Sequence, residues 1–389
     1  MQWLIWCMLF TVFRSGSSVL VNKTQLDALD RVHLRQARYF PFYTIGRIAN
    51  VPCVATNGLT GTCLIRGECA DNTGIFGGSC STNTNQATCC LFSRTCGGST
   101  NLNSTYFTNV GYPGSFNGGG TCTFTITPCS ASVCQLRIDF QSLALAQPDG
   151  DGNCITDVLS VTGGSSEVPL ICGDNTGQHV YVNFDSLNPI TIRIATTAST
   201  SFDRQWNLQL SQIACASQFR APEGCLQYHF GNTGTISSFN YGIGENPNPN
   251  SIGLTGSRQI ANHHYGICIR AGPDKCTITY SKPTSGGQYA FTVTSDANGV
   301  DPALMGQNML SDNGLACLTD YIVIPSPIVT DQAVAGIPFL DRFCGLGFYP
   351  VTSQVKPFVV YVFWDANEDG DIANRGFRLV YTQNACSVA

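Results

Sequence analysis

The chain has 389 residues, only 12% of them charged, and a formal net charge of −5. Average soluble proteins carry about 25% charged residues, and a nucleic-acid or polybasic membrane surface needs a basic face. The composition therefore argues against nucleic acid and against a polybasic membrane patch. The 43% hydrophobic content argues against wholesale disorder. The 20 cysteines indicate disulfides and an oxidising compartment, which argues against a cytosolic enzyme.

The first feature along the chain is an apolar run over residues 3–13. About eleven residues are too few to span a bilayer but suit the hydrophobic part of a signal peptide. Small residues follow at Ser15 and Ser17. We therefore predict a signal peptide over residues 1–18, with a buried N-terminal helix as the alternative. No later stretch reaches about 18 apolar residues, so we predict a secreted, extracellular protein without a membrane span.

Residues 19–52 contain no cysteine and only weak helical spacing, which predicts a leader or pro-segment. Arg38 ends a minimal processing site of the Arg-x-x-Arg kind, and the favoured alternative is a solvated basic segment. Two Asn-x-Thr tripeptides, at Asn22 and Asn103, predict N-glycosylation.

A cysteine-rich segment over residues 53–90 comes next. It holds six cysteines: Cys53, Cys63, Cys69, Cys80, Cys89 and Cys90. A segment this short has too small a core to fold alone, so we expect three disulfides to stabilise it. Zinc is the competing interpretation, and the missing Cys-x₂-Cys pair argues against it.

Two longer regions, 96–215 and 225–386, repeat each other in the same order. The matching residues are Cys154, Asp157, Cys172 and Trp206 in the first region and Cys317, Asp320, Cys344 and Phe377 in the second. Trp206 and Phe377 each stand nine residues before a final cysteine, Cys215 or Cys386. An ordered set of matches indicates an internal duplication.

Both repeats show the period of two that is typical of half-buried strands, for example over residues 136–140, 190–194 and 289–293. Gly, Asn, Pro and Ser fill the turns between them. Short strands at close spacing predict an all-β chain with two antiparallel β-sandwiches.

Each repeat resembles a CUB domain. A CUB domain is an extracellular β-sandwich of about 110 residues. The first carries Cys96-Gly-Gly, Tyr112-Pro113, Cys154-x₂-Asp157 and the closing strand at Trp206; the second matches more loosely. The whole plan resembles secreted arthropod CUB proteins that have a cysteine-rich segment ahead of the sandwich. That segment resembles a clip domain, in which the last two cysteines are adjacent.

The resemblance implies seven disulfides: Cys96–Cys122, Cys154–Cys172, Cys225–Cys268, Cys317–Cys344, Cys53–Cys89, Cys63–Cys80 and Cys69–Cys90. Cys129 and Cys134 are close enough in sequence to pair locally. Cys215, Cys276 and Cys386 remain, and their odd number leaves one partner unassigned. An unpaired cysteine predicts a free thiol or a disulfide-linked oligomer.

The sequence lacks the motifs of the common hydrolases. Gly-Asp-Ser-Gly-Gly, Gly-x-Ser-x-Gly and His-Glu-x-x-His are all missing, so we predict that the chain is not an enzyme. The adjacent pair His263 and His264 points to opposite faces if it lies on a strand and cannot easily chelate one ion. We interpret both as ordinary surface or turn histidines.

The resemblance also implies a calcium site built from three carboxylates. In the second repeat Asp320 and Asp365 match two of them, and Asp312 or Asp296 could supply the third. Hard oxygen ligands on neighbouring loops suit calcium, which takes six to eight oxygens. The alternative is a solvated acidic turn.

The first repeat keeps only one of these carboxylates, Asp157. Its closing loop has Thr196 and Thr197, and Gln147 or Asp149 would have to replace the first acid.

The sequence thus predicts a secreted, non-enzymatic interaction protein that binds an extracellular protein or glycan through CUB loops, with calcium as the expected cofactor. One alternative is a non-catalytic regulator of an extracellular protease cascade, which cleavage after Arg38 would support. The other is a disulfide-linked matrix protein, which oligomers on a non-reducing gel would support.

Overall fold

The structure is a computed structural model that describes residues 51–80, 87–198, 202–242, 257–297, 299–329, 341–366, 371 and 373–386. The predicted signal peptide, the leader up to residue 50, Asn22 and Arg38 lie outside these residues. The chain divides into two compact units, Met1–Ala49 and Asn50–Ala389, and the following concerns the second. In the described ranges no helix is both long enough and apolar enough to cross a membrane.

The cysteine-rich segment forms a small sheet and the one α-helix of the described residues. Its elements are β1 (Pro52–Val54), β2 (Thr60–Ile65), α1 (Arg66–Asp71), β3 (Ile75–Ser79) and β4 (Ala87–Arg94). Disulfides Cys53–Cys89, Cys63–Cys80 and Cys69–Cys90 hold it together. The sulfurs of Cys53, Cys63 and Cys80 lie within 4.8 Å of one another, but each belongs to a disulfide and is not available to zinc.

The first sandwich follows without a break, because β4 continues beyond Cys90 and pairs in parallel with β6. One sheet has the order β1-β2-β4-β6-β12-β8-β10, with β3 paired to β4, and the facing sheet has the order β5-β7-β11-β9. Its strands are β5 (Gly98–Thr100), β6 (Thr105–Thr108), β7 (Gly120–Ile126), β8 (Val133–Ala144), β9 (Asp157–Thr162), β10 (His179–Asn183), β11 (Ile190–Thr196) and β12 (Gln205–Ala214).

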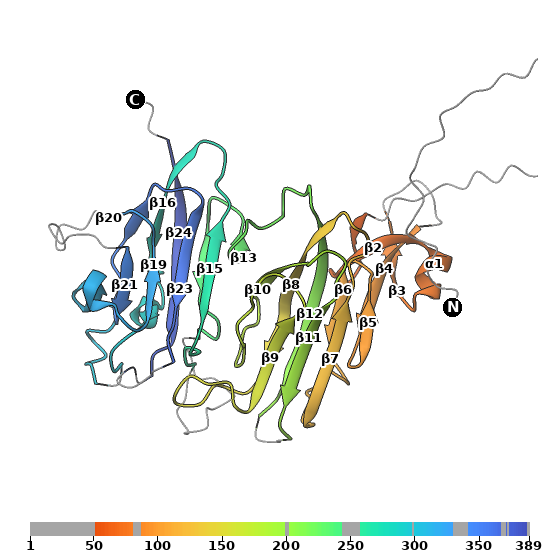
Figure 1. The fold of residues 1–389 in the computed structure, drawn as a ribbon, viewed down its shortest axis with the longest axis horizontal. Coiled ribbons are helices and arrows are strands. Elements are labelled where there is room, and N and C mark those ends of the chain that lie inside the picture. The colour runs from red at the N-terminus through yellow and green to blue at the C-terminus, as the bar shows by residue number, and fades with distance from the viewer. Residues whose placement is uncertain are drawn as a thin grey trace, which may run out of the picture. The chain divides into compact units, whose positions relative to one another are not determined.

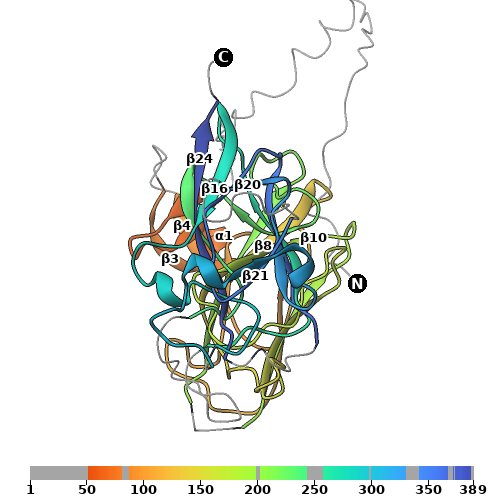
Figure 2. The same ribbon diagram turned by 90° about the vertical axis from the view of Figure 1, so that its left-hand side faces the viewer.

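The second sandwich repeats this plan with sheets β13-β15-β23-β19-β21-β18 and β14-β24-β16-β22-β20, and β17 pairs with β24 (Figure 1). Figure 2 shows β24, β16 and β20 of the second sheet from the side. The first sheet contains β13 (Cys225–His229), β15 (His264–Ile269), β18 (Ser311–Asn313), β19 (Tyr321–Val323), β21 (Arg342–Gly345) and β23 (Phe358–Phe363). The second contains β14 (Thr233–Ser237), β16 (Lys275–Ser281), β17 (Phe291–Thr292), β20 (Pro327–Val329), β22 (Val351–Ser353) and β24 (Gly376–Ala385). Three 3₁₀ turns complete it: Gly287–Tyr289, Asn308–Leu310 and Gly314–Ala316.

The predicted all-β class with two sandwiches is confirmed. The alternation on β8 places Leu136, Ile138 and Phe140 in the core, each at most 1% exposed. Most strand pairs are antiparallel, and three are parallel: β4 with β6, β5 with β7, and β13 with β15. Strands β5 and β13 are edge strands, and β4 enters from the cysteine-rich segment.

Six disulfides cross-link the sandwiches. Four join the pairs that the CUB resemblance implies: Cys96–Cys122, Cys154–Cys172, Cys225–Cys268 and Cys317–Cys344. The expected local pair of Cys129 with Cys134 is wrong, because Cys134 bonds to Cys215. Strand register explains this: Val133 on β8 pairs with Ala214 on β12, which brings the next residues together. Cys276 and Cys386 are joined in the same way through β16 and β24.

Candidate functional site

The predicted carboxylate loops meet at one end of each sandwich because of how the strands pair. Asp157 begins β9 and pairs with Thr196 at the end of β11. In the second sandwich Tyr321 pairs with Phe363, so Asp320 lies next to the loop that follows β23. The aspartate after the third cysteine is therefore close to the closing loop in both repeats.

In the first sandwich a guanidinium group already occupies the position beside this aspartate. Arg204 Nε lies 2.6 Å from Asp157 Oδ2, and both side chains are fully buried. The backbone N–H groups of Ala146 and Thr197 also donate to the carboxylate, at 2.9 and 3.3 Å. Arg204 Nη2 donates to the carbonyl oxygen of Thr197 at 2.6 Å. The buried negative charge is therefore neutralised by the protein itself.

The other candidate ligands of the first sandwich are engaged elsewhere. Gln147 exchanges two hydrogen bonds with Asn240, at 3.1 and 2.7 Å. Asp149 Oδ1 accepts from the N–H groups of Asp151 and Asn153, at 3.0 and 2.8 Å. With an arginine on the one remaining acid, these residues do not fit a calcium ion.

In the second sandwich the structure brings Asp320 and Asp365 together. Asp320 is fully buried, and its Oδ1 accepts the backbone N–H of Asp365 at 2.8 Å. Its Oδ2 accepts from Gln259 Nε2 at 2.5 Å. One donor to the buried carboxylate is here a neutral amide, whereas a guanidinium donates to the carboxylate in the first sandwich.

A third carboxylate, Asp371, belongs to the same loop and was not selected from the sequence. Its Oδ1 accepts the N–H of Ser295 at 2.6 Å. Burial and the negative charge of Asp365 raise the pKa of Asp371, against the opposing effects of Ser295 and Arg258. Asp320, Asp365 and Asp371 offer the oxygen donors that calcium prefers, and they are the residues that would hold the ion. Among the described residues, however, only the sulfurs of Cys53, Cys63 and Cys80 lie together as closely as a group of three ligands, so calcium would have to draw these acids closer.

The remaining candidates lie elsewhere in the second sandwich. Asp312 is on β18, opposite Cys344, and its charge acts on Tyr349. Strand β21 lies between β18 and β19, which separates Asp312 from Asp320. Asp296 is in a turn, where its backbone carbonyl oxygen accepts a hydrogen bond from the N–H of Gly299 at 3.1 Å.

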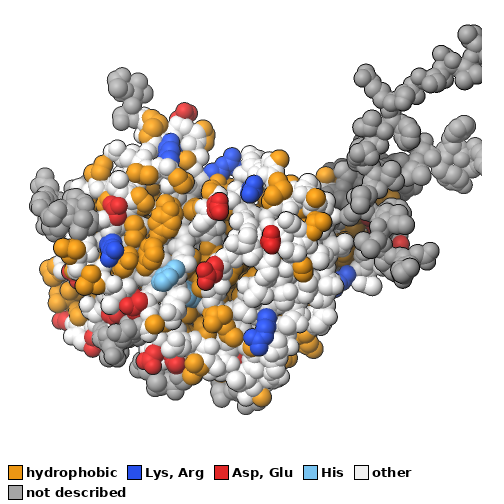
Figure 3. All heavy atoms as spheres, viewed as in Figure 1, with side chains coloured by type: hydrophobic (Ala, Val, Ile, Leu, Met, Phe, Trp, Pro, Cys, Tyr) orange, Lys and Arg blue, Asp and Glu red, His pale blue; other side chains and the backbone are white. Residues whose placement is uncertain are grey.

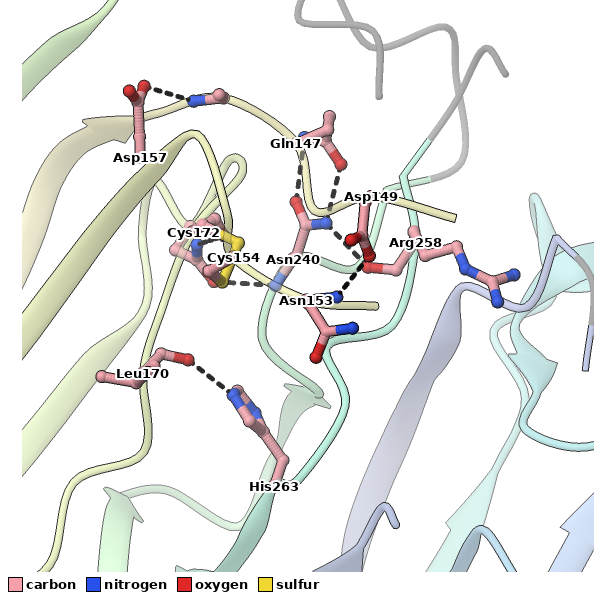
Figure 4. Close-up of a disulfide and its surroundings, with 12 residues drawn as sticks. Gln147, Asp149, Asn153, Cys154, Asp157, Leu170, Cys172, Asn240, Arg258 and His263 are labelled. Atoms are coloured by element: carbon pink, nitrogen blue, oxygen red, sulfur yellow. Dashed lines mark hydrogen bonds between the residues drawn. A yellow bond between two sulfur atoms is a disulfide. The ribbon is translucent and has the colours of Figure 1, made fainter. Parts of the chain in front are cut away.

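Asn240 joins the two sandwiches (Figure 4). Besides the two bonds with Gln147, its side chain accepts from the N–H of Asp174 at 2.9 Å and donates to the carbonyl oxygen of Arg258 at 2.7 Å. Its own N–H donates to Asn175 Oδ1 at 2.7 Å. Its φ of 60° is left-handed, a region that asparagine adopts more readily than most residues.

Histidines make further contacts between the sandwiches. His263 is 1% exposed, and its Nε2 lies 2.7 Å from the carbonyl oxygen of Leu170. The interpretation of His263 as a surface or turn residue is therefore wrong, whereas His264 beside it is exposed. We call the following set of contacting residues the seam: Gln147, Leu170, Asp174, Asn175 and His179 of the first sandwich, and Tyr228, His229, Asn240 and His263 of the second.

A row of aromatic side chains lies on the outer face of the β13–β18 sheet. Tyr321 stacks on Phe363 with ring centroids 5.3 Å apart, and His264 is 5.6 Å from Phe363. The Arg342 guanidinium lies 4.4 Å from the Tyr321 ring centroid. Figure 3 shows hydrophobic side chains gathered on this face, with a histidine at the edge of the patch. Exposed apolar patches of this kind are often contact surfaces.

The predicted glycosylation site Asn103 is half-buried. Its Oδ1 accepts the N–H groups of Ser104 and Gln212, at 2.9 and 2.7 Å. Glycosylation there stays a prediction.

Two tandem sandwiches, each with a buried aspartate three residues after a disulfide-bonded cysteine, define a class of disulfide-linked β-sandwich modules. A family model described as "Animal CUB domain" matches residues 222–384, and one described as "CUB domain" matches residues 96–209. The chain therefore belongs to the CUB domain family and contains two CUB domains. Such domains commonly mediate protein interactions and sometimes bind calcium. The arthropod-type plan and the clip-like character of the N-terminal segment stay predictions.

Solved structures that are similar to the chain have low identity to it. The CUB1-EGF-CUB2 domains of rat MASP-1 are 15% identical, with a TM-score of 0.25, over 75% of this chain and 99% of that chain. The corresponding human MASP-1/3 region is 16% identical, with a TM-score of 0.24, over 72% of this chain and 98% of that chain. The MASP-1 CUB2 domain bound to Ca²⁺ is 17% identical, with a TM-score of 0.26, over 30% of this chain and 98% of that chain. No curated protein sequence matches the chain.

Proposed function

We propose that the chain is a secreted, non-enzymatic interaction protein that binds an extracellular protein or glycan through the loops of its second CUB domain. The observation that carries the proposal is the contact between the backbone N–H of Asp365 and the buried carboxylate of Asp320. It fixes two acids from different loops at one end of the sandwich. CUB domains typically have no catalytic role, which supports a binding function.

The first domain offers less for this purpose. Arg204 neutralises Asp157, and Gln147 is bonded to Asn240 of the second domain. The carboxylate loops of the first domain therefore contact residues of this chain, either in the same domain or in the second one. The loops of the second domain, with Asp365 only partly buried, are the better candidates for an external partner.

Calcium would be held by Asp320, Asp365 and Asp371, and it would supply positive charge that orders these loops. The protein's own contribution is to orient the acids. Gln259 and the Asp365 N–H fix the Asp320 carboxylate, and Ser295 fixes Asp371. The partly exposed Asp365 carboxylate is then placed to accept a hydrogen bond from a basic side chain of a partner.

Calcium binding is tested by isothermal titration calorimetry on the mature protein. We expect one calcium ion per chain, no binding by D320N/D365N, and unchanged binding by D151N/D203N, which removes two exposed carboxylates of the first domain. Equal heats for the wild type and D320N/D365N would refute the calcium site.

Partner binding is tested by capture from native extracellular fluid, with calcium and with EDTA, followed by mass spectrometry. We expect a partner that the wild type and D151N/D203N capture and that D320N/D365N loses. A partner retained by D320N/D365N would refute the assignment of these loops. Self-linked oligomers without any partner would favour the matrix-protein alternative.

A further inference from the structure

Two histidines face each other across the seam. His179 is on β10 of the first domain and His229 ends β13 of the second, and their ring centroids are 4.9 Å apart. His179 is 6% exposed, and His229 is partly buried. The backbone N–H of Tyr228 donates to His179 Nε2 at 3.0 Å. This hydrogen bond joins the two domains directly.

The bond requires a neutral imidazole, because a ring nitrogen can accept only when it carries no proton. Protonation would turn His179 Nε2 into a donor, and the carbonyl oxygen of Tyr228 lies 3.1 Å from the same atom. The Tyr228 N–H would then lose its acceptor. Strand β13 is an edge strand and pairs only with β15 in the described sheet. His179 therefore meets the edge of β13 that faces away from β15.

The nearest charged group, Arg137, also disfavours protonation of the pair. On β8, Arg137 forms an ion pair with Asp139 at 2.6 Å, and Arg137 Nη1 donates to the hydroxyl of Tyr181 on β10 at 2.8 Å. Two groups of the second domain lie nearby. Tyr228 is on β13, where burial raises the pKa of its hydroxyl, and the positive charge of Arg270, which follows β15, opposes that effect.

Burial and positive neighbours lower the pKa of both rings. Burial, the His229 ring and Arg137 hold the pKa of His179 well below its usual range. Burial and Arg137 lower the pKa of His229 to about 4. In the closed arrangement both rings are therefore neutral at neutral pH.

We propose that the seam is an acid-sensitive joint, in which protonation of His179 and His229 separates the two CUB domains. The open form exposes both rings, which then bind protons at an ordinary pKa of about 6.5. Above that pH neither form takes up a proton, so the ratio of open to closed forms does not change with pH. As the pH falls below 6.5, the open form binds protons that the closed form does not. The ratio of open to closed forms then rises by up to about tenfold per pH unit for each histidine. For His229 this continues until the pH reaches the closed-form pKa of about 4.

The other seam histidine serves as a contrast. His263 Nε2 faces the carbonyl oxygen of Leu170, which accepts a hydrogen bond from a neutral or a protonated ring alike. Protonation of His263 would keep that bond, but burial lowers the pKa of His263 to about 4, so His263 adds to the acid sensitivity of the seam without losing a hydrogen bond.

The test is hydrogen–deuterium exchange of the full chain between pH 7.5 and 4.5, read on peptides that contain Tyr228 and corrected for the intrinsic exchange rate. Small-angle X-ray scattering of the same samples measures domain separation. We compare the wild type with H179Q/H229Q, in which a glutamine oxygen can still accept the Tyr228 N–H. The matched control is H264Q, which removes an exposed histidine.

We expect protection of Tyr228 in the wild type and in H264Q to fall at least about tenfold between pH 6.5 and 5.0, with an increased radius of gyration. Protection in H179Q/H229Q should fall much less than in the wild type over this range, with His263 accounting for what remains of the fall, and H229Q alone should lose part of the pH dependence. Equal protection of the wild type at pH 7.5 and 4.5 would overturn the proposal. So would an equal loss in H179Q/H229Q.

Discussion

The buried ion pair of the first domain gives the sharpest stability prediction. We expect R204M to destabilise this domain, because it leaves the Asp157 carboxylate buried without its cation. Removing one partner of a buried pair costs about 3–5 kcal/mol. Both side chains here are fully buried and 2.6 Å apart, which matches that case. With a urea slope of about 2 kcal/mol per M, the loss corresponds to a midpoint lower by about 2 M.

The assay is urea denaturation read by pulsed hydrogen exchange and mass spectrometry, which follows β11 of the first domain and β23 of the second separately. The control is R137M, which breaks an ion pair of the same 2.6 Å length whose side chains are 29% and 21% exposed. Because water screens this partly exposed pair, we expect its loss to cost less than the loss of the fully buried pair. We expect D157N/R204M to recover most of the loss, because no charge then remains buried. A cost for R204M no larger than that for R137M would refute the argument.

The remaining predictions concern the seam and a disulfide. G173A should disrupt the seam, because Gly173 has a φ of +76° and an added Cβ would collide with the side-chain oxygen of Asn240. The control G177A has a similar φ and nothing within 4 Å, so hydrogen exchange at Asp174 should increase in G173A only. C134S/C215S should lower the unfolding free energy by about 1.3 kcal/mol more than C154S/C172S in the same denaturation assay, because the first bridge spans 81 residues and the second 18. Equal losses would contradict the chain-entropy explanation.

The features that the sequence predicted correctly depend on local patterns or on the repeat. The period of two on β8 predicted its buried face. The CUB resemblance implied that Asp320 and Asp365 lie together, one after a cysteine and the other after an apolar strand, and a hydrogen bond joins the two residues, while their role as a calcium site stays a prediction. Neither inference needs the register between strands that are distant in the chain.

The features that sequence reasoning missed depend on that register or on contacts between domains. Cys134 meets Cys215 only because β8 pairs with β12. Asn240 meets Gln147 across 93 residues, and no local pattern marks either residue. Arg204 had one usable signal, since it stands two residues before the buried Trp206. A period of two then points the arginine to the core, where a charge needs a partner.

The duplicated position of this arginine explains why the two domains differ. Arg375 stands two residues before Phe377, as Arg204 does before Trp206. Its guanidinium lies 4.6 Å from the Tyr289 ring centroid, and Nη1 donates to the carbonyl oxygen of Gly242 at 3.4 Å. Gln259, a neutral residue, donates to Asp320. The arginine position that neutralises the carboxylate in the first domain thus also contacts the loop of Gly242 in the second. The two domains therefore differ in the side chains around the buried aspartate, and this difference is what D320N/D365N, with D151N/D203N as its control, tests.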